Sequence, residues 1–533
     1  MPQQPSASEV IQGMHMDTMV EAAHTAQVEA AHAAQAKAAQ TAQAKDEFFA
    51  ASMYMFHVTG FPQQSGVLTD PVGAPPGARL EVWRTDPADS EHIPGPGAEL
   101  VRLSTQGFSL ANSGNRTLNA PKRSWKVELE GAAHGGAHLA GMARVNLKSM
   151  YNDPSQMREA LAWRLLRNVG IPAARHTYAK LAFDDTYYGL FSLIEQVDKR
   201  FLKDHFGGND RGNLYKAYCG DVGCATLQYR TGPDGDDGGR QYYKGDDGNR
   251  TYRLKTNEDD PSAGTYDDLA ALIKTINGIR LPGGDERFDT DTFRASVDAM
   301  MNAQAFLRWA AVNLLLGSWD NYYATPSNYY LYNSGHPGAG GDFMRRPYFT
   351  FIPWDYDNCL GIDYFGTKWQ YTDILNWPDY QGNGSRDNVA SRIPLVHNLL
   401  RNRDYRQFYL DYLEFLLDTQ FNAHAIAEQI APESGSGLWS RVCQAAYLES
   451  NTPTGQPFTG RQFTNDEVYR SGWKQYELQH EKEKAEGIIH YVRMRHDSAR
   501  QQLKQLRADT PRANGSAGFP AAMENGGAVA ATG

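Results

Sequence analysis

The sequence predicts an α+β protein with two lobes, the first mainly of strands and the second mainly of helices. Short apolar runs interrupted by Gly and Pro fill residues 50–130, a pattern typical of strands. After about residue 264 the apolar residues recur at helical spacing instead. A chain of 533 residues also exceeds the size of one ordinary hydrophobic core. We therefore expect more than one packed unit.

The composition divides the chain into four segments. Residues 1–48 are rich in Ala and Gln, with high helix propensity and little to bury, so we expect a helical or disordered extension. Residues 49–200 form the expected first lobe and residues 201–507 the second. The Gly- and Ala-rich residues 508–533 are expected to be a disordered tail.

The first lobe is expected to contain strands, one helix and a hairpin. Asp153 is a good N-cap with Pro154 at the first helical position, and Gly170 closes the helix. A hairpin turned at Asp184-Asp185 then leads to Glu195. The strands expected before the helix are SMYMFHVTGF, ARLEVWRT, AELVRLS and SWKVELEG.

The second lobe is expected to begin with a loop and continue with helices. Gly and Asp crowd residues 228–263, where the spacing does not fit an EF-hand and a loop with a small ribbon is the better prediction. A short strand pair is expected between residues 328 and 354. Helices are expected at 265–279, 291–317, 395–430 and 464–507.

Charge and hydropathy exclude some classes of function. The formal net charge of −10 and the pI near 5.9 argue against a general nucleic-acid binder. No segment approaches the ~20 apolar residues that a membrane span needs, and no secretory signal is evident. We expect a cytoplasmic protein, or an extracytoplasmic one if a signal was removed. The four cysteines fit a reduced compartment, although Cys219 and Cys224 are close enough to bridge across a turn.

An apolar run near residue 350 ends in two carboxylates, Asp355 and Asp357. Side chains alternate in an extended segment, so the two would face the same way, roughly 7 Å apart. Such hard oxygen ligands suit Mg²⁺, Mn²⁺ or Ca²⁺, and substrate phosphates and water complete the shell of Mg²⁺. A surface turn with two solvated acids is the alternative.

Another acid, Asp320, precedes this pair and favours a metal site over a surface turn. Asp320 follows an apolar helix on an expected loop, Asn328 comes eight positions later, and a strand then leaves. Acid, Asn, strand and metal-binding acid follow the same order in the catalytic core of protein kinases. The Asp-to-Asn spacing there is about five, so this loop must be longer.

Several motifs, in order from about residue 100 to 500, resemble the spore-coat CotH kinase family. Its members are similar to atypical kinases that bind ATP with a divalent metal and phosphorylate protein Ser or Thr. The motifs that carry the resemblance are DPSQMREAL from Asp153, GIPAAR from Gly170, YGLFSLIEQVDKRFL from Tyr188, GNLYK from Gly212, WDN from Trp319, NYYLY from Asn328 and IPWDYD from Ile352.

The resemblance implies roles for matching positions. Asp320 would be the catalytic-loop acid, Asn328 a metal or phosphate partner and Asp355 the metal-binding aspartate, with Asp357 assisting. Lys126, in a basic strand, would contact the transferred phosphoryl group, although Lys122 or Lys148 could replace it.

Three further positions would complete the nucleotide site. Glu159 on the capped helix is the expected partner of the lysine. Backbone groups of Glu195 to Val197, where a kinase has its interlobe hinge, would hold adenine. The glycine-rich phosphate cover of ordinary kinases is absent, and Arg116 is the candidate to stand in for it.

Phosphoryl transfer from ATP to a protein Ser or Thr hydroxyl is the leading hypothesis. The same site on a small-molecule acceptor, or transfer of AMP, is the second. A nucleotide-binding pseudokinase scaffold is the third, and a glycoside hydrolase that uses two carboxylates the fourth. The sequence does not indicate the oligomeric state.

Overall fold

The computed structural model describes residues 39–509, with gaps at 52, 63–66, 86–97, 115, 132–137, 221–222, 231–243, 245–249, 280, 364–365, 377–392, 436, 451–462, 474–476 and 481–482. Most of the Ala/Gln-rich extension, the whole of the predicted tail and much of the Gly/Asp-rich loop therefore lie outside the described residues.

A nine-stranded sheet fills the N-terminal half, in the order β2-β5-β6-β7-β9-β8-β1-β3-β4. Its strand pairs are antiparallel except β1 with β8, which run parallel. The predicted hairpin turn is confirmed, because Phe183 pairs with Thr186 across Asp184 and Asp185. The strands are β1 (Tyr54–Thr59), β2 (Val72–Gly73), β3 (Arg79–Arg84), β4 (Glu99–Thr105), β5 (Phe108–Ser113), β6 (Ser124–Leu129), β7 (Arg144–Lys148), β8 (His176–Phe183) and β9 (Thr186–Glu195).

The helix of the first lobe, α2 (Arg158–Asn168), starts later than predicted. Asp153 does not cap it. Its carboxylate instead accepts bonds from the Ser155 and Arg158 amides, and Gln156 has a φ of +55°, so the residues before Arg158 form a turn. Gly170 follows the helix end with a φ of +72°, as its predicted closing role requires.

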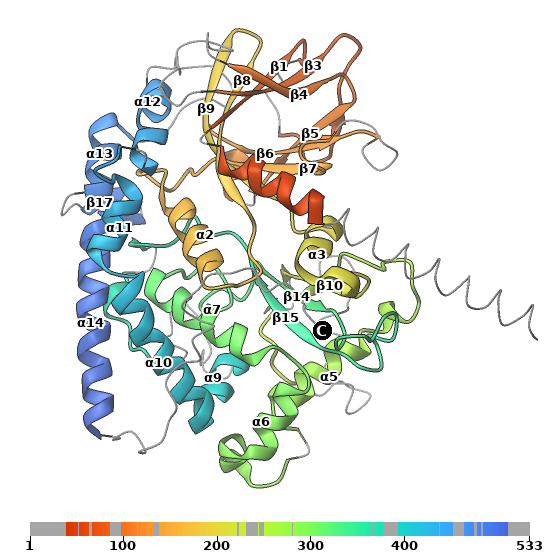
Figure 1. The fold of residues 1–533 in the computed structure, drawn as a ribbon, viewed down its shortest axis with the longest axis vertical. Coiled ribbons are helices and arrows are strands. Elements are labelled where there is room, and N and C mark those ends of the chain that lie inside the picture. Colours follow the sequence, from red (N-terminus) through yellow and green to blue (C-terminus); the bar gives the residue numbers. More distant parts are fainter. Residues whose placement is uncertain are drawn as a thin grey trace, which may run out of the picture.

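A four-stranded sheet, β13-β10-β14-β15, lies below the large sheet in the view of Figure 1. The predicted strand pair is present as β14 and β15, and β10 places a third strand beside it. The strands are β10 (Asn213–Ala217), β13 (Tyr252–Leu254), β14 (Tyr329–Asn333) and β15 (Phe349–Pro353), and a separate ribbon joins β11 (Cys219–Gly220) to β12 (Gly223–Cys224).

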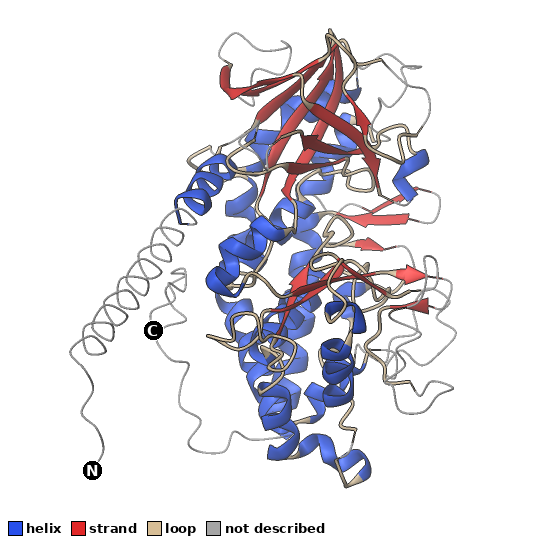
Figure 2. Cartoon of the chain, turned by 90° about the vertical axis from the view of Figure 1, so that its right-hand side faces the viewer, coloured by secondary structure: helices blue, strands red, loops and turns tan. Residues whose placement is uncertain are grey.

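Helices dominate the later part of the chain and surround this small sheet (Figure 2). A large sheet first and mostly helices later confirm the α+β prediction. The helices are α3 (Lys199–Phe206), α5 (Asp267–Ile276), α6 (Asp291–Asp298), α7 (Ala303–Leu316), α9 (Pro394–Arg401), α10 (Arg403–Thr419), α11 (Ala423–Ile430), α12 (Leu438–Ser450), α13 (Asn465–Trp473) and α14 (Ile488–Asp509).

The prediction of one helix over residues 464–507 was wrong in its middle. Strands β17 (Glu477–His480) and β18 (Glu483–Glu486) separate α13 from α14, and β18 pairs with β16 (Ile362–Asp363). The segment has strong helix formers, but pairing with a distant strand overrides that local preference. Within the described residues, none of the helices combines the length and apolar character that a bilayer crossing requires.

Arg158, at the start of α2, holds this helix against the C-terminal part of the chain. Its guanidinium is completely buried and pairs with Asp153 at 2.5 Å. It also donates to the Ser471 hydroxyl at 3.0 Å and to the carbonyl oxygens of Leu360 and Glu486. One side chain thus joins four segments and fixes the position of the residue that follows it, Glu159.

Candidate active site

Asn328 and Asp355 meet at one edge of the small sheet. Tyr329 pairs with Pro353 in the β14–β15 register, so the residues just before β14 and just after β15 lie opposite each other. The Trp354 amide donates to the Asn328 carbonyl at 3.1 Å and extends the pairing. Asn328 and Asp355 both have left-handed backbones, with φ of +53° and +62°. Such strain in non-glycine residues persists where the surrounding structure holds it, often at functional sites.

The extended segment expected through Asp357 does not form, because β15 ends at Pro353. The two carboxylates still belong to one cluster. Tyr356 between them points into the core, where its hydroxyl accepts from Trp309 Nε1 at 2.6 Å and donates to Asn313 at 3.0 Å. Burial raises the pKa of Asp357 well above its usual range, and the neighbouring charge of Asp355 raises it further.

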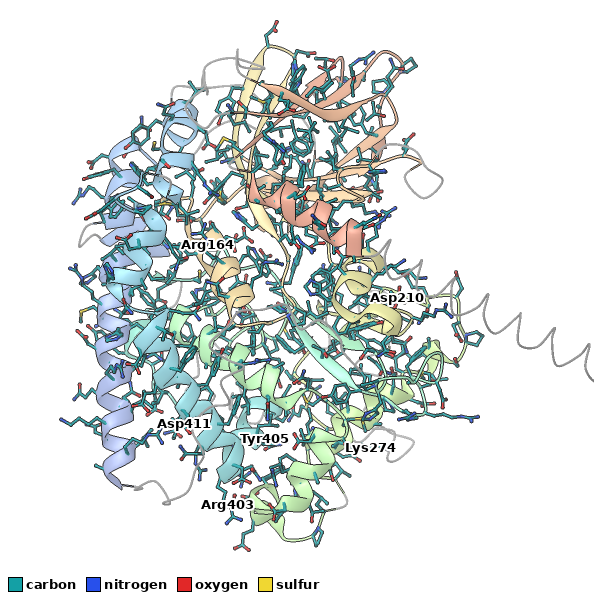
Figure 3. The ribbon with its side chains drawn as sticks, in the orientation of Figure 1. Arg164, Asp210, Lys274, Arg403, Tyr405 and Asp411 are labelled. Atoms are coloured by element: carbon teal, nitrogen blue, oxygen red, sulfur yellow. A yellow bond between two sulfur atoms is a disulfide. The ribbon has the colours of Figure 1, made fainter. Side chains whose placement is uncertain are left out.

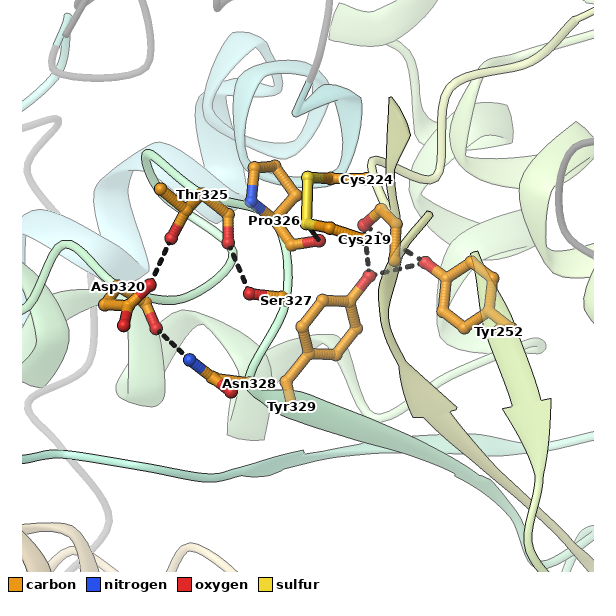
Figure 4. Close-up of a disulfide and its surroundings, with 10 residues drawn as sticks. Cys219, Cys224, Tyr252, Asp320, Thr325, Pro326, Ser327, Asn328 and Tyr329 are labelled. Carbon is orange, nitrogen blue, oxygen red and sulfur yellow. Dashed lines mark hydrogen bonds between the residues drawn. A yellow bond between two sulfur atoms is a disulfide. The ribbon is translucent and has the colours of Figure 1, made fainter. Parts of the chain in front are cut away.

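Asp320 lies on the loop between α7 and β14, beside Thr325 and Asn328 (Figure 4), and its carboxylate interacts electrostatically with Asp355. Its carboxylate accepts from the Thr325 hydroxyl at 2.6 Å and from the Asn358 amide at 3.4 Å. Burial raises the pKa of Asp320, and the charge of Asp355 adds to that rise. The Asn328 Nδ2 donates to the Asp320 carbonyl at 2.9 Å, which leaves the amide oxygen of Asn328 as its ligand atom.

The disulfide between Cys219 and Cys224 supports this loop from behind (Figure 4). Directly after the ribbon, the Ala225 amide donates to the Pro326 carbonyl at 2.9 Å. The Ala225 carbonyl accepts from the Tyr329 hydroxyl at 2.5 Å. The ribbon therefore contacts both ends of the short segment that carries Asn328. The bridge that the sequence allowed is present.

Lys148, at the end of β7, forms the ion pair that joins the large sheet to the acids. Its ammonium lies 2.6 Å from Asp355 Oδ1, and both side chains are largely buried. Burial lowers the pKa of Lys148, but the charges of Asp355, Asp357 and Glu159 outweigh it and raise that pKa above its ordinary value. Lys148 therefore stays charged at all physiological pH values.

The other two candidate lysines do not pair with these acids. Lys122 is buried in an ion pair with Glu449 of α12 at 2.6 Å, which makes its role structural. Lys126 on β6 is exposed. The pKa of Lys216 on β10 is lowered to about 8, mainly by burial and further by the charge of Lys126. Lys126 thus faces the same region as the acids but forms no described bond to them.

Glu159 lies on α2 beside this cluster. Its Oε1 accepts from Trp163 Nε1 at 3.2 Å, and a hydrogen bond from the Tyr356 backbone also reaches this carboxylate. Burial raises the pKa of Glu159 to about 7, while the charge of Lys148 opposes that rise. Glu159 therefore acts on Lys148 through its charge, because the ammonium itself bonds to Asp355.

Glu195 and Val197 lie at the end of β9, where the resemblance implies the nucleotide hinge. The Glu195 carboxylate is buried and pairs with Lys45 and Arg175, each at 3.0 Å. Burial raises the pKa of Glu195, but these two cations lower it below its usual value. The Val197 carbonyl accepts from the Gln196 side chain at 3.1 Å. Arg116 begins a short 3-10 helix, Arg116–Asn119, and its side chain lies outside the described part.

The site holds more negative than positive charge. The charge of Asp355 raises the pKa of Asp320, Asp357 and Glu159, and Lys148 is the cation that offsets this effect most directly. No group of three or more His, Cys, Asp or Glu side chains among the described residues forms a ready-made metal cage. Oxygen donors with uncompensated charge fit a hard cation whose shell is completed by phosphates and water.

Two residues that the sequence reasoning did not single out orient Asp320. Thr325 precedes the Pro-Ser-Asn run, and Asn358 follows Asp357 directly. A polar residue next to a candidate ligand was the available signal for Asn358. Nothing in the local sequence marks Thr325, because its contact depends on how the loop folds back.

Comparison with known proteins gives a family match that includes the residues of this site. A family model described as "CotH kinase protein" matches residues 110–434, more than half of the chain. The chain belongs to the CotH kinase family. The matched region includes Lys148, Glu159, Asp320, Asn328 and Asp355, so the family assignment and the acidic cluster concern the same part of the molecule.

Three curated relatives are similar at low identity. Invasin CotH2 of Rhizopus delemar is 23% identical over 61% of this chain and 48% of its own length. Invasin CotH3 of the same organism is 22% identical over 61% and 47%. The inner spore coat protein H of Bacillus subtilis is 21% identical over 66% of this chain and 80% of its own length. The chain thus spans about half the length of the two invasins that it matches.

Proposed function

We propose that this protein transfers the terminal phosphoryl group of ATP to a Ser or Thr hydroxyl of a protein, with a divalent cation, in a two-lobed kinase-like fold. The observation that carries the proposal is the meeting of Asp320, Asn328 and Asp355 with Lys148 in a chain of the CotH kinase family. Phosphoryl transfer depends mainly on positioning and on stabilising charge, which is what such a cluster provides.

Asp320 is the residue that orients the acceptor hydroxyl and takes its proton. Its raised pKa makes it a better proton acceptor than a solvated carboxylate. The bonds from Thr325 and Asn358 hold the carboxylate in one orientation. Orientation of the attacking oxygen is where a kinase-type acid contributes to the rate.

Asp355 and the amide oxygen of Asn328 would hold the divalent cation, with Asp357 assisting. A divalent cation held by these residues would supply positive charge against the negative charge that develops during transfer. Mg²⁺ is the preferred candidate because it is commonly bound through one or two carboxylates plus substrate phosphates. Mn²⁺ and Ca²⁺ have similar oxygen preferences and are the alternatives.

Lys148 replaces Lys126 as the proposed phosphate-contacting lysine. It is held between Asp355 and the charge of Glu159, next to where the phosphates would lie, whereas Lys126 is exposed. Glu159 keeps its proposed role of orienting this lysine, by charge rather than by a direct bond. Lys126 and Lys216 add positive charge near the acids, where they would attract the polyphosphate.

Adenine is proposed to bind to the backbone of Glu195 to Val197, because the Glu195 carboxylate is committed to Lys45 and Arg175. Arg116 stays a predicted phosphate contact.

Incubation with ATP labelled at the γ-phosphate tests the proposal. The purified chain is supplied with Mg²⁺ or Mn²⁺ and a mixture of candidate protein acceptors, and intact and digested proteins are analysed by mass spectrometry. Phosphoryl addition on Ser or Thr supports the proposal. Adenylyl addition, or phosphorylation of small molecules alone, would assign the site to another acceptor or another transferred group.

A further inference from the structure

A cavity of about 310 Å³ lies against α2, outside the acidic cluster. It is bounded by α2, the start of β8, the start of α12 and the helix over residues 39–50. Arg164 projects from α2 into the region between that helix and the C-terminal helices (Figure 3). A volume of this size is near the lower end of the roughly 300–1,000 Å³ typical of small-molecule sites.

Positive charge dominates the lining of this cavity. Four arginines contribute to it, Arg164, Arg167, Arg175 and Arg441, against a single lining carboxylate, Asp46. Asp46 is shared, because it lies 2.7 Å from Arg175 and 3.4 Å from Arg167. It therefore leaves the other arginines of the lining unneutralised.

Arg164 and Arg441 are the uncompensated pair. Both are partly buried, and neither has a carboxylate within ion-pairing distance or a described side-chain hydrogen bond in the part of the chain that the structure covers. Burial lowers the pKa of Arg164, and the charge of Arg441 adds to the effect. The two guanidinium groups therefore lie close enough to repel each other. Two like charges brought together without a counter-ion are costly unless an anion joins them.

Three further polar groups of the lining already have hydrogen-bond partners. The Tyr178 hydroxyl donates to the Gln156 carbonyl at 2.8 Å, and the Thr177 hydroxyl donates to the Ala51 carbonyl at 2.7 Å. His176 bonds to Ser192 at 3.0 Å, and burial together with the charges of Arg164 and Arg441 lowers its pKa to about 3. Asn168 also lines the cavity but is exposed, so Arg164 and Arg441 are the cationic groups of the lining without a described partner.

We propose that this cavity binds a phosphate monoester of small-molecule size, held between Arg164 of α2 and Arg441 of α12. A guanidinium offers a planar fork of donors that matches two phosphate oxygens, and two forks from different helices suit one dianion. The assignment is independent of the proposed kinase activity, because none of the acids of the candidate active site lines the cavity.

An anion in this position would tether α2 to α12. Trp163 lines the cavity and also donates to Glu159 at 3.2 Å, so the same helix that holds the anion carries a residue of the acidic cluster. Ligand binding here is therefore connected to the candidate active site through one helix and one indole ring.

Titration calorimetry with glycerol phosphate, inorganic phosphate and pyrophosphate tests the proposal. It is done on the full chain with a chelator present, so that a cation-dependent nucleotide site is silent, and at constant ionic strength. We expect saturable binding of glycerol phosphate that weakens at least tenfold in Arg164→Gln and in Arg441→Gln. A phosphoserine peptide is titrated under the same conditions. Arg403→Gln, which removes an exposed arginine at the start of α10, is the matched control and should bind as the wild type does.

Three results would overturn the proposal. They are unchanged binding in both arginine variants, loss of binding in Arg403→Gln alone, and saturable binding of the phosphoserine peptide with none of the small anions. Binding of inorganic phosphate as tight as that of glycerol phosphate would reduce the ligand to the free ion and also contradict the monoester assignment. Arg441 makes no described side-chain bond, so Arg441→Gln is expected to fold even if Arg164→Gln does not, and it decides the matter alone.

Discussion

The Lys148 ammonium lies 2.6 Å from the Asp355 carboxylate, so an ion pair joins the end of β7 in the nine-stranded sheet to the turn that follows β15 in the small sheet. The two residues are 207 positions apart in the sequence. Because Asp355 is the proposed cation ligand, nucleotide binding would replace one partner of Lys148 by phosphate oxygens. The lysine thus has an anionic partner both before and after the nucleotide binds.

Replacement of Lys148 or Lys126 by methionine tests which of the two lysines contacts the phosphates. Lys148→Met should lower phosphoryl transfer by about 100-fold, the size of effect seen when one donor to developing charge is removed. Lys126→Met is the matched control on the neighbouring strand and should lose less than tenfold, since its side chain is exposed. Steady-state rates at saturating ATP make the comparison. Equal losses of phosphoryl transfer in both variants would make Lys126 a candidate for the phosphate-contacting lysine again.

Removal of the proposed acceptor-orienting acid should affect transfer and not binding. Asp320→Asn keeps the shape of the side chain and its bond to Thr325, but it cannot take a proton. We expect ATP affinity within about threefold of the wild type and transfer lowered by about 100-fold or more, as general-base loss produces. Asp342→Asn, on an exposed loop between β14 and β15, is the matched control. Transfer by Asp320→Asn at the rate of the Asp342→Asn control would show that Asp320 has another role.

Arg158 should matter for stability far more than an exposed arginine. Arg158→Met leaves the buried Asp153 carboxylate without its cation and should lower the free energy of unfolding by about 3–5 kcal/mol. Arg403→Met, at an exposed helix start, should change it by less than about 0.5 kcal/mol. Urea unfolding followed by circular dichroism measures both. A loss below about 1 kcal/mol for Arg158→Met would mean that the buried network is not stabilising.

His176 should make the protein less stable in acid. Its pKa is lowered to about 3 in the folded state, so below about pH 6.5 the unfolded chain takes up a proton that the folded chain does not. His176 therefore costs no stability above about pH 6.5, and below that pH the free energy of unfolding falls as the pH decreases. Between about pH 7.5 and about pH 5.5, His176→Gln should lose roughly 1.4 kcal/mol less than the wild type. Identical pH profiles of unfolding would exclude a neutral, buried His176.

Much of the fold follows from local patterns. The apolar spacing of residues 291–317 predicts a helix, which the structure divides into α6 and α7, and the turn at Asp184-Asp185 predicts the β8–β9 hairpin. The late start of α2 was missed because Asp153 caps a turn with the same bonds that it would use to cap a helix. The β17–β18 hairpin was missed because its pairing partner, β16, is distant in the sequence.

The sequence predicted the acids of the candidate site but did not identify its lysine. Asp320, Asn328 and Asp355 occur in short motifs at the ends of elements, which local reasoning can find. Lys122, Lys126 and Lys148 all lie in or near the neighbouring strands β6 and β7, and the packing against α12 and the turn after β15 decides which of them reaches the acids. The arginine pair Arg164 and Arg441 has no local signal, since its members lie on helices far apart in the chain.

The most direct test of the account is calorimetric titration of ATP into the wild type and Asp355→Ala, with Mg²⁺, with Mn²⁺ and with a chelator. We expect binding by the wild type that requires the cation, and no detectable heat from Asp355→Ala under any of the three conditions. Binding that is indifferent to the cation, or that survives intact in Asp355→Ala, would contradict the claim that these acids and a nucleotide share one metal ion.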